Sequence, residues 1–378
     1  MPQKAPLATI IEHFSNIEDP RRYNRRHLLL DIMVIAVCAA ICGADDWVAV
    51  EAFGQAKFEW LKQFLQLPHG IPSHDTFGAV FAVLDAEQFQ ASFIGWVQAA
   101  TKSMSGQIVP IDGKKLRRSH DKATGKEAIH MVSAWASENS LVLGQLKVDD
   151  KSNEITAIPH LLDLLEIEDC IVTIDAMGCQ KKIARKIVVE KRADYVLALK
   201  GNQGNLSEDV QELFEQAEKT GLEAAEYHRT EEKGHGRIEI RECWTLSGTE
   251  QLASIRNLAK WQALQTVIMV RSERIVNDEK SEEKRFFISS LDGDAQQALG
   301  AVRGHWGIEN KVHWVLDIAF REDESRVRKG NGAQNFAVLR HIALNLLKQE
   351  KTAKCGIKNK RLKAGWDNDY LLKVLSGG

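Results

Sequence analysis

The sequence lacks the cysteine patterns of a disulfide-stabilised or zinc-binding protein. It contains six cysteines in 378 residues, and none of them forms a C-x-x-C pair. Cys38 and Cys42 lie one helical turn apart in an apolar run, which is typical of buried free thiols. We therefore expect no disulfide framework, and this use of cysteine fits a reducing, cytoplasmic location.

Long apolar runs are also missing. The most apolar stretch covers residues 32–43, which is shorter than the roughly 20 residues that a membrane-spanning helix needs. We interpret it as a buried helix and expect no membrane partner. The first six residues contain no apolar core of a secretory signal.

A net charge of one sign is absent as well. The formal net charge is −2 at pH 7, which by itself indicates no polyanionic partner. Basic residues nevertheless outnumber acidic ones in residues 101–126, 181–203 and 303–363, whereas acidic residues dominate residues 205–232. Such blocks are often only solvated faces. Basic surface is also what a phosphodiester substrate requires.

Residues 1–100 have a helical pattern and predict an all-α N-terminal domain. We expect a buried helix at residues 28–44, an amphipathic helix at residues 47–65, and a helix that begins after Ser73, a typical N-cap residue. Short helices on either side of the turn before Ser73 are compatible with a helix-turn-helix contact to DNA or with simple packing.

From residue 107 onward, the pattern changes to strands and helices. Strands are predicted at residues 108–111, 130–137, 141–148, 171–174 and 195–199, and helices at residues 155–165 and 180–191. This order predicts an α/β fold in which a mixed sheet is covered by helices.

The remainder of the chain predicts an insertion, further helices and a tail. An acidic helix and several strand-like segments occupy residues 205–300, so we expect a β-rich insertion there. Helical periodicity returns at residues 296–348. The catalytic domain would therefore cover residues 101–348 and be interrupted by the insertion. We expect residues 349–378 to form a basic and polar C-terminal tail.

Three acidic residues are the candidates for a catalytic centre. Asp112 and Asp175 follow two similar runs, Ile-Val-Pro-Ile and Ile-Val-Thr-Ile, and Glu309 lies in a predicted helix. Carboxylates at the strand ends of an α/β sheet occupy the usual place for a site. Ligand sets made only of oxygen suit Mg²⁺ or Mn²⁺, and carboxylates that hold two such ions promote phosphodiester cleavage.

Each candidate also has a simpler interpretation. Asp112 begins an Asp-Gly pair, which is a common turn signal, and Asp175 can cap the following helix. His305, Glu309 and His313 recur at four-residue spacing, so a zinc site is a further alternative. The two histidines can also contact phosphate or orient the glutamate.

A second polar motif lies at residues 233–241. Glycines flank His235, and Arg237, Glu239 and Arg241 alternate onto one face of a predicted strand. The motif predicts either a hairpin tip that contacts DNA or a set of cross-strand ion pairs.

Together these segments resemble a known family. The matching motifs lie at residues 111–114, 175–180, 199–203, 235–239 and 305–310, with further matches in residues 326–347. They resemble bacterial insertion-sequence transposases of the DDE type, and among these the H-repeat-associated branch. The resemblance covers essentially the whole chain.

The resemblance implies an RNase H-like catalytic core with a β-rich insertion, preceded by the helical N-terminal domain. It implies that Asp112, Asp175 and Glu309 bind Mg²⁺ or Mn²⁺. The implied reaction is hydrolysis at the ends of the element, followed by attack of the freed 3′-hydroxyl on target DNA. The expected partner is double-stranded DNA, bound by a homodimer. The side chains expected to contact DNA are Lys114, Lys200, Asn202, His235, Arg237, His305, Lys311, Arg326 and Arg328.

One departure from the family pattern affects the helix that carries the glutamate. The family often has tyrosine, arginine and lysine at positions −7, −4 and +7 from this glutamate, where this chain has Val302, His305 and Leu316. Other basic side chains would have to replace the missing phosphate contacts. A DNA-binding protein without catalytic activity, and a metal-dependent nuclease without strand transfer, are therefore the alternative functions.

Overall fold

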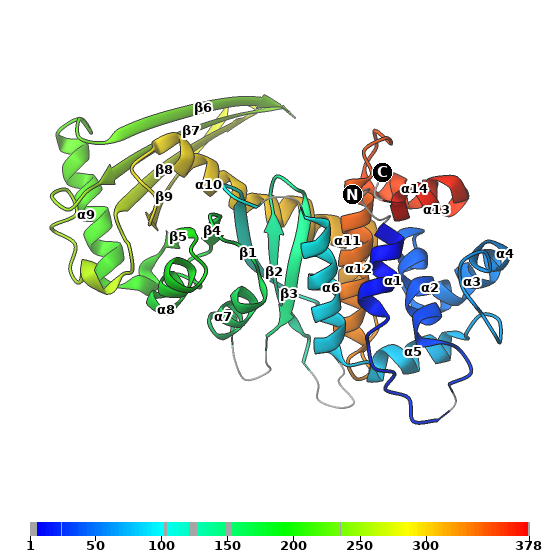
Figure 1. Ribbon diagram of the computed structural model, residues 1–378. Helices are drawn as coiled ribbons and strands as arrows, with labels where there is room; N and C mark the ends of the chain where they lie inside the picture. Colours follow the sequence, from blue (N-terminus) through cyan, green and yellow to red (C-terminus); the bar gives the residue numbers. More distant parts are fainter. Residues whose placement is uncertain are drawn as a thin grey trace.

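The computed structural model describes residues 6–23, 25–101, 104–120, 127–148, 153–234 and 236–376. The central sheet has a strand-rich extension at one end and a group of helices at the other (Figure 1). Within the described ranges, no helix is both long enough and apolar enough to cross a membrane.

A mixed sheet organises the molecule. The described residues form nine strands in the order β3-β2-β1-β4-β5-β9-β8-β7-β6. The first five are β1 (Ile108–Lys115), β2 (His130–Ala136), β3 (Leu141–Lys147), β4 (Ile171–Ile174) and β5 (Asp194–Leu199). Strand β1 pairs antiparallel with β2 and parallel with β4, which pairs parallel with β5. The expected α/β class with an RNase H-like mixed sheet is confirmed.

The insertion continues this sheet. It contains α9 (Asn205–Lys219), β6 (Glu226–Gly234), β7 (Arg237–Ser247), β8 (Thr266–Val276) and β9 (Glu279–Ser289). Strand β9 pairs antiparallel with β5, so the insertion extends the core sheet. The sequence did not predict β6, because this edge strand is mostly exposed and lacks an alternating apolar face.

Helices precede the sheet, as expected. They are α1 (Pro6–Phe14), α2 (Leu29–Ile41), α3 (Trp47–Ala56), α4 (Phe58–Leu61), α5 (His74–Val83) and α6 (Ala86–Ala100). The helix predicted at residues 47–65 is interrupted at Lys57, where α3 ends. Ser73 caps α5, because its Oγ accepts a hydrogen bond from the Thr76 N–H. The apolar side chains of this region share one buried cluster with the sheet.

The remaining helices cover the sheet or follow it. They are α7 (Glu154–Leu164), α8 (Lys181–Arg185), α10 (Ala295–Ile308), α11 (Trp314–Phe320), α12 (Gly332–Gln349), α13 (Ile357–Trp366) and α14 (Asn368–Ser376). The segment expected to be a tail thus contains two helices. Its basic residues obscured a buried stripe that includes Ala364, Leu371 and Val374.

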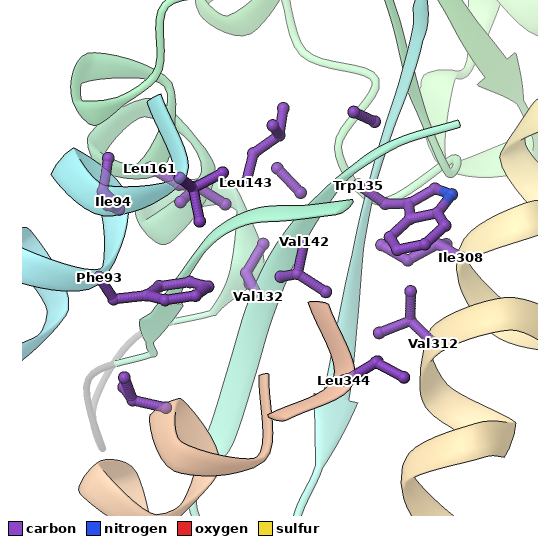
Figure 2. Close-up of a cluster of buried hydrophobic side chains, with 14 of the residues drawn as sticks. Phe93, Ile94, Val132, Trp135, Val142, Leu143, Leu161, Ile308, Val312 and Leu344 are labelled. Carbon is purple, nitrogen blue, oxygen red and sulfur yellow. The ribbon is translucent and has the colours of Figure 1, made fainter. Parts of the chain in front are cut away.

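The packing of α10 and the following turn on the sheet positions one wall of the site. Trp135 of β2 is completely buried. It lies beside Ile308, above Val312 and Leu344 (Figure 2). Helix α10 also contacts β1 and β4. These contacts fix Glu309, which directly follows Ile308, relative to the central strands.

Candidate active site

The pairing of β1 with β4 brings the two aspartates together. The strands run parallel and in register from Ile108–Ile171 to Ile111–Ile174. Asp112 and Asp175 directly follow the last paired residues, Ile111 and Ile174, and both line the same pocket. The two runs that looked alike in the sequence are therefore direct neighbours in the sheet.

Asp112 lies inside a strand rather than at its end. Strand β1 continues to Lys115, because Asp112 pairs with Ser133 of β2 beyond the point where pairing with β4 stops. The turn interpretation of the Asp-Gly pair is therefore wrong. A Cβ at Gly113 would lie 2.1 Å from Glu154 Oε1, so any larger residue there would displace the Glu154 side chain. Nε2 of His130 lies 2.9 Å from the same oxygen.

Asp175 combines its place in the pocket with a structural role. Its Oδ1 accepts hydrogen bonds from the N–H groups of Met177, at 3.0 Å, and Gly178, at 3.2 Å. These bonds shape the turn after β4 and hold the carboxylate at the end of the strand. The alternative that Asp175 caps the following helix is therefore wrong, because α8 begins only at Lys181 and the hydrogen bonds of Asp175 close the turn before it.

Glu309 enters the same pocket from the helical layer. It is exposed, and it begins a π-helical turn at Glu309–His313 between α10 and α11. Such turns are rare and occur frequently at functional sites. Two neighbouring strands and one packed helix therefore supply the three acids to a single pocket.

The carboxylates repel one another. Burial, together with the negative charges of Glu154, Glu309 and Asp175, raises the pKa of Asp112 to about 7, although a hydrogen bond from the Gly113 N–H opposes the rise. A bound cation would relieve this repulsion. In the described ranges, however, no three His, Cys, Asp or Glu side chains form a closed metal-binding cluster. The acids share a pocket but are not drawn together around one point.

The two histidines of the glutamate helix contact the strands. Nδ1 of His305 lies 3.0 Å from Oγ1 of Thr173, and Nδ1 of His313 lies 3.4 Å from Oδ2 of Asp112. Burial lowers the pKa of both imidazoles, that of His313 to about 3. Both are therefore neutral near pH 7, and His313 forms no ion pair with Asp112. Because these partners keep the histidines from gathering around Glu309, the zinc alternative is not supported in the described part of the chain.

Lys114 faces the interior instead of DNA. Its side chain is 12% exposed, and its Nζ lies 2.5 Å from Oδ1 of Asp317 and 2.7 Å from Oε2 of Glu322. The family resemblance led us to expect DNA contact by this lysine, and its acidic partners, about 200 residues away along the chain, gave no sign of an internal role. In the structure, it belongs to an internal ion-pair network.

Four other nominated side chains lie near the pocket or on the insertion. Lys200 is exposed and lines the pocket. Asn202 donates a hydrogen bond from Nδ2 to the Ala176 carbonyl at 2.9 Å, so it supports the turn after Asp175. Arg237 is exposed and lies 2.8 Å from Glu239. Arg237 and Glu239 belong to the same strand, but Nη1 of Arg241 in β7 lies 3.0 Å from Oε2 of Glu232 in β6, so the cross-strand alternative is present at that pair. His235 falls outside the described residues.

The last three nominated side chains belong to the glutamate helix and the segment after it. Lys311 and Arg326 are exposed. Arg328 is half-buried and donates a hydrogen bond from Nε to the Arg118 carbonyl at 2.9 Å. None of the three lines the pocket that contains the acids.

Sequence reasoning missed the basic and aromatic groups that the insertion brings to the pocket. Lys284 and Arg285 of β9 line it together with Trp306. The guanidinium carbon of Arg285 lies 4.7 Å from the centre of the Trp306 ring. Only the pairing of β9 with β5 places these groups here. By contrast, Val302 and Leu316, which replace two polar residues of the family pattern, are buried.

Known families match the chain over almost its full length. The model described as "Transposase DDE domain" matches residues 84–346, and the model described as "DDE_Tnp_1-associated" matches residues 11–97. The chain belongs to the DDE transposase family. The pocket acids, Asp112, Asp175 and Glu309, all lie within the span of the first match.

Relatives of this DDE transposase carry the expected names. "H repeat-associated putative transposase YhhI" of Escherichia coli strain K12 is 41% identical over 376 residues, which cover 98% of each chain. "Putative transposase YncI" of Escherichia coli O157:H7 is 42% identical over 374 residues, covering 98% of this chain and 95% of the relative. A piggyBac transposase in a synaptic complex with hairpin DNA is 10% identical with a TM-score of 0.41, covering 97% of this chain and 77% of that one, a likeness too low to support an argument.

Proposed function

We propose that this DDE transposase cleaves DNA at the ends of a mobile element and joins the freed 3′-hydroxyl to target DNA. The proposed catalytic residues are Asp112, Asp175 and Glu309. The observation that carries the proposal is the in-register pairing of β1 with β4, which puts the aspartates side by side, while the helical layer brings the glutamate to the same pocket.

We further propose Mg²⁺ or Mn²⁺ as the cofactor, in keeping with the divalent metals that the family generally uses. A donor set of carboxylates alone fits these ions, and the mutual repulsion that raises the pKa of Asp112 favours a cation. When bound, such ions activate the attacking oxygen and stabilise the leaving one. The chain itself holds two ligands on paired strands and the third on a packed helix, so that the phosphodiester is oriented between them.

The basic side of the pocket is the proposed contact surface for DNA. Lys200, which directly follows β5, and Arg285 of β9 both line it, and Arg285 packs against Trp306 of α10. Cations of this kind bind phosphates, and the face of Trp306 offers a stacking surface for a base. Arg285 would supply the charge that neutral His305 lacks. This arrangement supports double-stranded DNA as the partner, while a homodimer on DNA is the expected assembly.

An assay that scores nicking and joining separately tests the proposal. Purified full-length protein is incubated with a duplex that carries the flanking repeats of its element and with a target plasmid, with and without Mg²⁺. The proposal predicts Mg²⁺-dependent nicks at the repeat ends and joined products. Nicking without joining would indicate a nuclease, and binding without either product would indicate a DNA-binding protein without activity.

A further inference from the structure

We propose that Lys114 is a positioning residue that connects the strand of Asp112 to the helix of Glu309 and so sets the spacing of the catalytic acids. The inference deepens the proposed function and rests on it. Lys114 follows Asp112 by two positions in β1, and side chains two residues apart in a strand point to the same face of the sheet. The lysine therefore extends toward the helical layer that carries Glu309.

The ammonium group contacts that layer at three points. Nζ lies 2.5 Å from Oδ1 of Asp317 in α11, 2.7 Å from Oε2 of Glu322, and 3.4 Å from the carbonyl oxygen of His313. A lysine ammonium has three hydrogen atoms to donate. All three donors are thus occupied by the helix and the segment after it, and none is left for a phosphate.

The contact with His313 joins Lys114 to the turn that contains the glutamate. His313 is the last residue of the π-helical turn that Glu309 begins, and Asp317 lies one helical turn further along. The first residue of this turn supplies the proposed ligand, and the last is bound by the lysine. Lys114 therefore fixes the register of this turn against β1.

Glu322, one of the acids that bind Lys114, also contacts a second cation. Glu322 is 2% exposed, and its Oε1 lies 3.7 Å from Nη1 of Arg340 in α12. Arg340 is equally buried, so this carboxylate lies between two cations from different elements. Because removal of one partner from a buried ion pair leaves an uncompensated charge, the arrangement resists displacement. Strand β1, helix α11 and helix α12 are thereby held in one geometry.

The test uses Lys114→Met and measures the Mg²⁺ concentration that gives half-maximal nicking. Misplacement of a reacting group by 1 Å can cost on the order of 100-fold in rate. We expect this concentration to rise by at least about tenfold, since loosely held ligands bind the ion less tightly. The affinity of the full-length protein for Mn²⁺, measured by titration calorimetry without DNA, should fall by a similar factor.

Lys360→Met is the matched control. Lys360 is also a buried lysine, and its Nζ donates a hydrogen bond to the Leu347 carbonyl at 3.0 Å and lies 3.4 Å from Oε2 of Glu350. It does not line the pocket of the acids. This variant should lose stability but keep the Mg²⁺ dependence of the wild type. A loss of stability alone therefore cannot imitate the expected result.

The outcomes separate this inference from the proposed function. If the wild type nicks DNA and Lys114→Met needs no more Mg²⁺ than Lys360→Met, the inference is wrong and the function stands. If the wild type does not nick DNA, the function fails, and Mn²⁺ binding still decides whether Lys114 sets the spacing. Should Lys114→Met not fold, Asp317→Asn removes one charged acceptor while keeping a polar side chain. The inference then requires a higher Mg²⁺ concentration for Asp317→Asn, and an unchanged value overturns it.

Discussion

The glutamate helix packs tightly on the central strand at Gly304, and we predict that an alanine there separates the catalytic acids. A Cβ at Gly304 would lie 2.8 Å from Cγ2 and 2.9 Å from Cδ1 of Ile108. Gly304 precedes Glu309 by five residues in the helical layer, and Ile108 precedes Asp112 by four residues in β1. The contact therefore joins the two elements that carry these acids.

The magnitude follows from these distances. Nonbonded carbon atoms pack at about 3.5–4.0 Å, so α10 must move away from β1 by about 1 Å. Overpacking of this kind costs about 1–3 kcal/mol of stability. A displacement of about 1 Å at the reacting groups can lower the rate on the order of 100-fold. We expect Gly304→Ala to show both effects, measured as urea unfolding and as Mg²⁺-dependent nicking.

Gly300→Ala is the control, because it changes the same helix one turn earlier, where a Cβ meets nothing within 4 Å. This variant should gain about 0.5–1 kcal/mol from helix propensity and keep its activity. Adding Ile108→Ala to Gly304→Ala removes the two nearest atoms and should restore part of the rate. Wild-type activity in Gly304→Ala alone would show that the contact with Ile108 does not set the spacing of the acids.

Two further predictions concern DNA binding and stability. Arg285→Ala should weaken binding to element-end DNA and lower the slope of log affinity against log salt concentration by about one, the value for one lost phosphate contact. Arg274→Ala, outside the pocket, should change neither quantity. Equal effects of the two substitutions would contradict the proposed contact surface. Burial acts to raise the pKa of Glu350, but hydrogen bonds to its carboxylate, including those from Thr352 and Tyr370, outweigh this effect. The net result lowers the pKa from 4.5 to about 2. Its stabilising contribution, about 1.5–3 kcal/mol for hydrogen bonds to a charged group, is complete above about pH 4.5 and disappears as pH falls toward 2. The unfolding curves of wild type and Glu350→Gln should therefore differ at pH 7 and converge at low pH, and a constant difference would contradict this assignment.

The sequence was most informative where function and local structure coincide. The β-branched runs before Asp112 and Asp175 predicted two strands, and these strands are neighbours in the sheet. Ser73 predicted the start of α5 through its capping hydrogen bond. Such signals are local, since they depend on side-chain shape and on bonds that span only a few residues.

Features that depend on distant contacts could not be predicted. The family resemblance suggested that Lys114 contacts DNA, and its internal role was hidden because its acidic partners lie far away in sequence. Glu154 showed no sign of its place beside Asp112, because only the packing of α7 brings it there. Arg285 reaches the pocket only because β9 pairs with β5. In each case, tertiary pairing rather than local propensity decides the environment of the side chain.

Charge also concealed regular structure in two segments. Strand β6 contains mostly charged residues and is held by pairing with β7 along its whole length. Helix α13 is rich in basic residues, yet the inward side chains of α13 and of the following α14 are buried. Hydrophobic periodicity is a weak guide for an edge strand or a short amphipathic helix, because few positions face the core.

Nicking of element-end DNA by Asp112→Asn is the most direct test of whether the three acids form the catalytic centre. The substitution keeps the size of the side chain and removes its negative charge, so the fold and DNA binding should persist. We predict a loss of Mg²⁺-dependent nicking by more than about 100-fold, since changes to residues that merely support a metal ligand already cost about 10- to 100-fold. Asp278→Asn, at the exposed turn between β8 and β9, should leave nicking unchanged. Wild-type nicking by Asp112→Asn would contradict the assignment of the three acids as the catalytic centre.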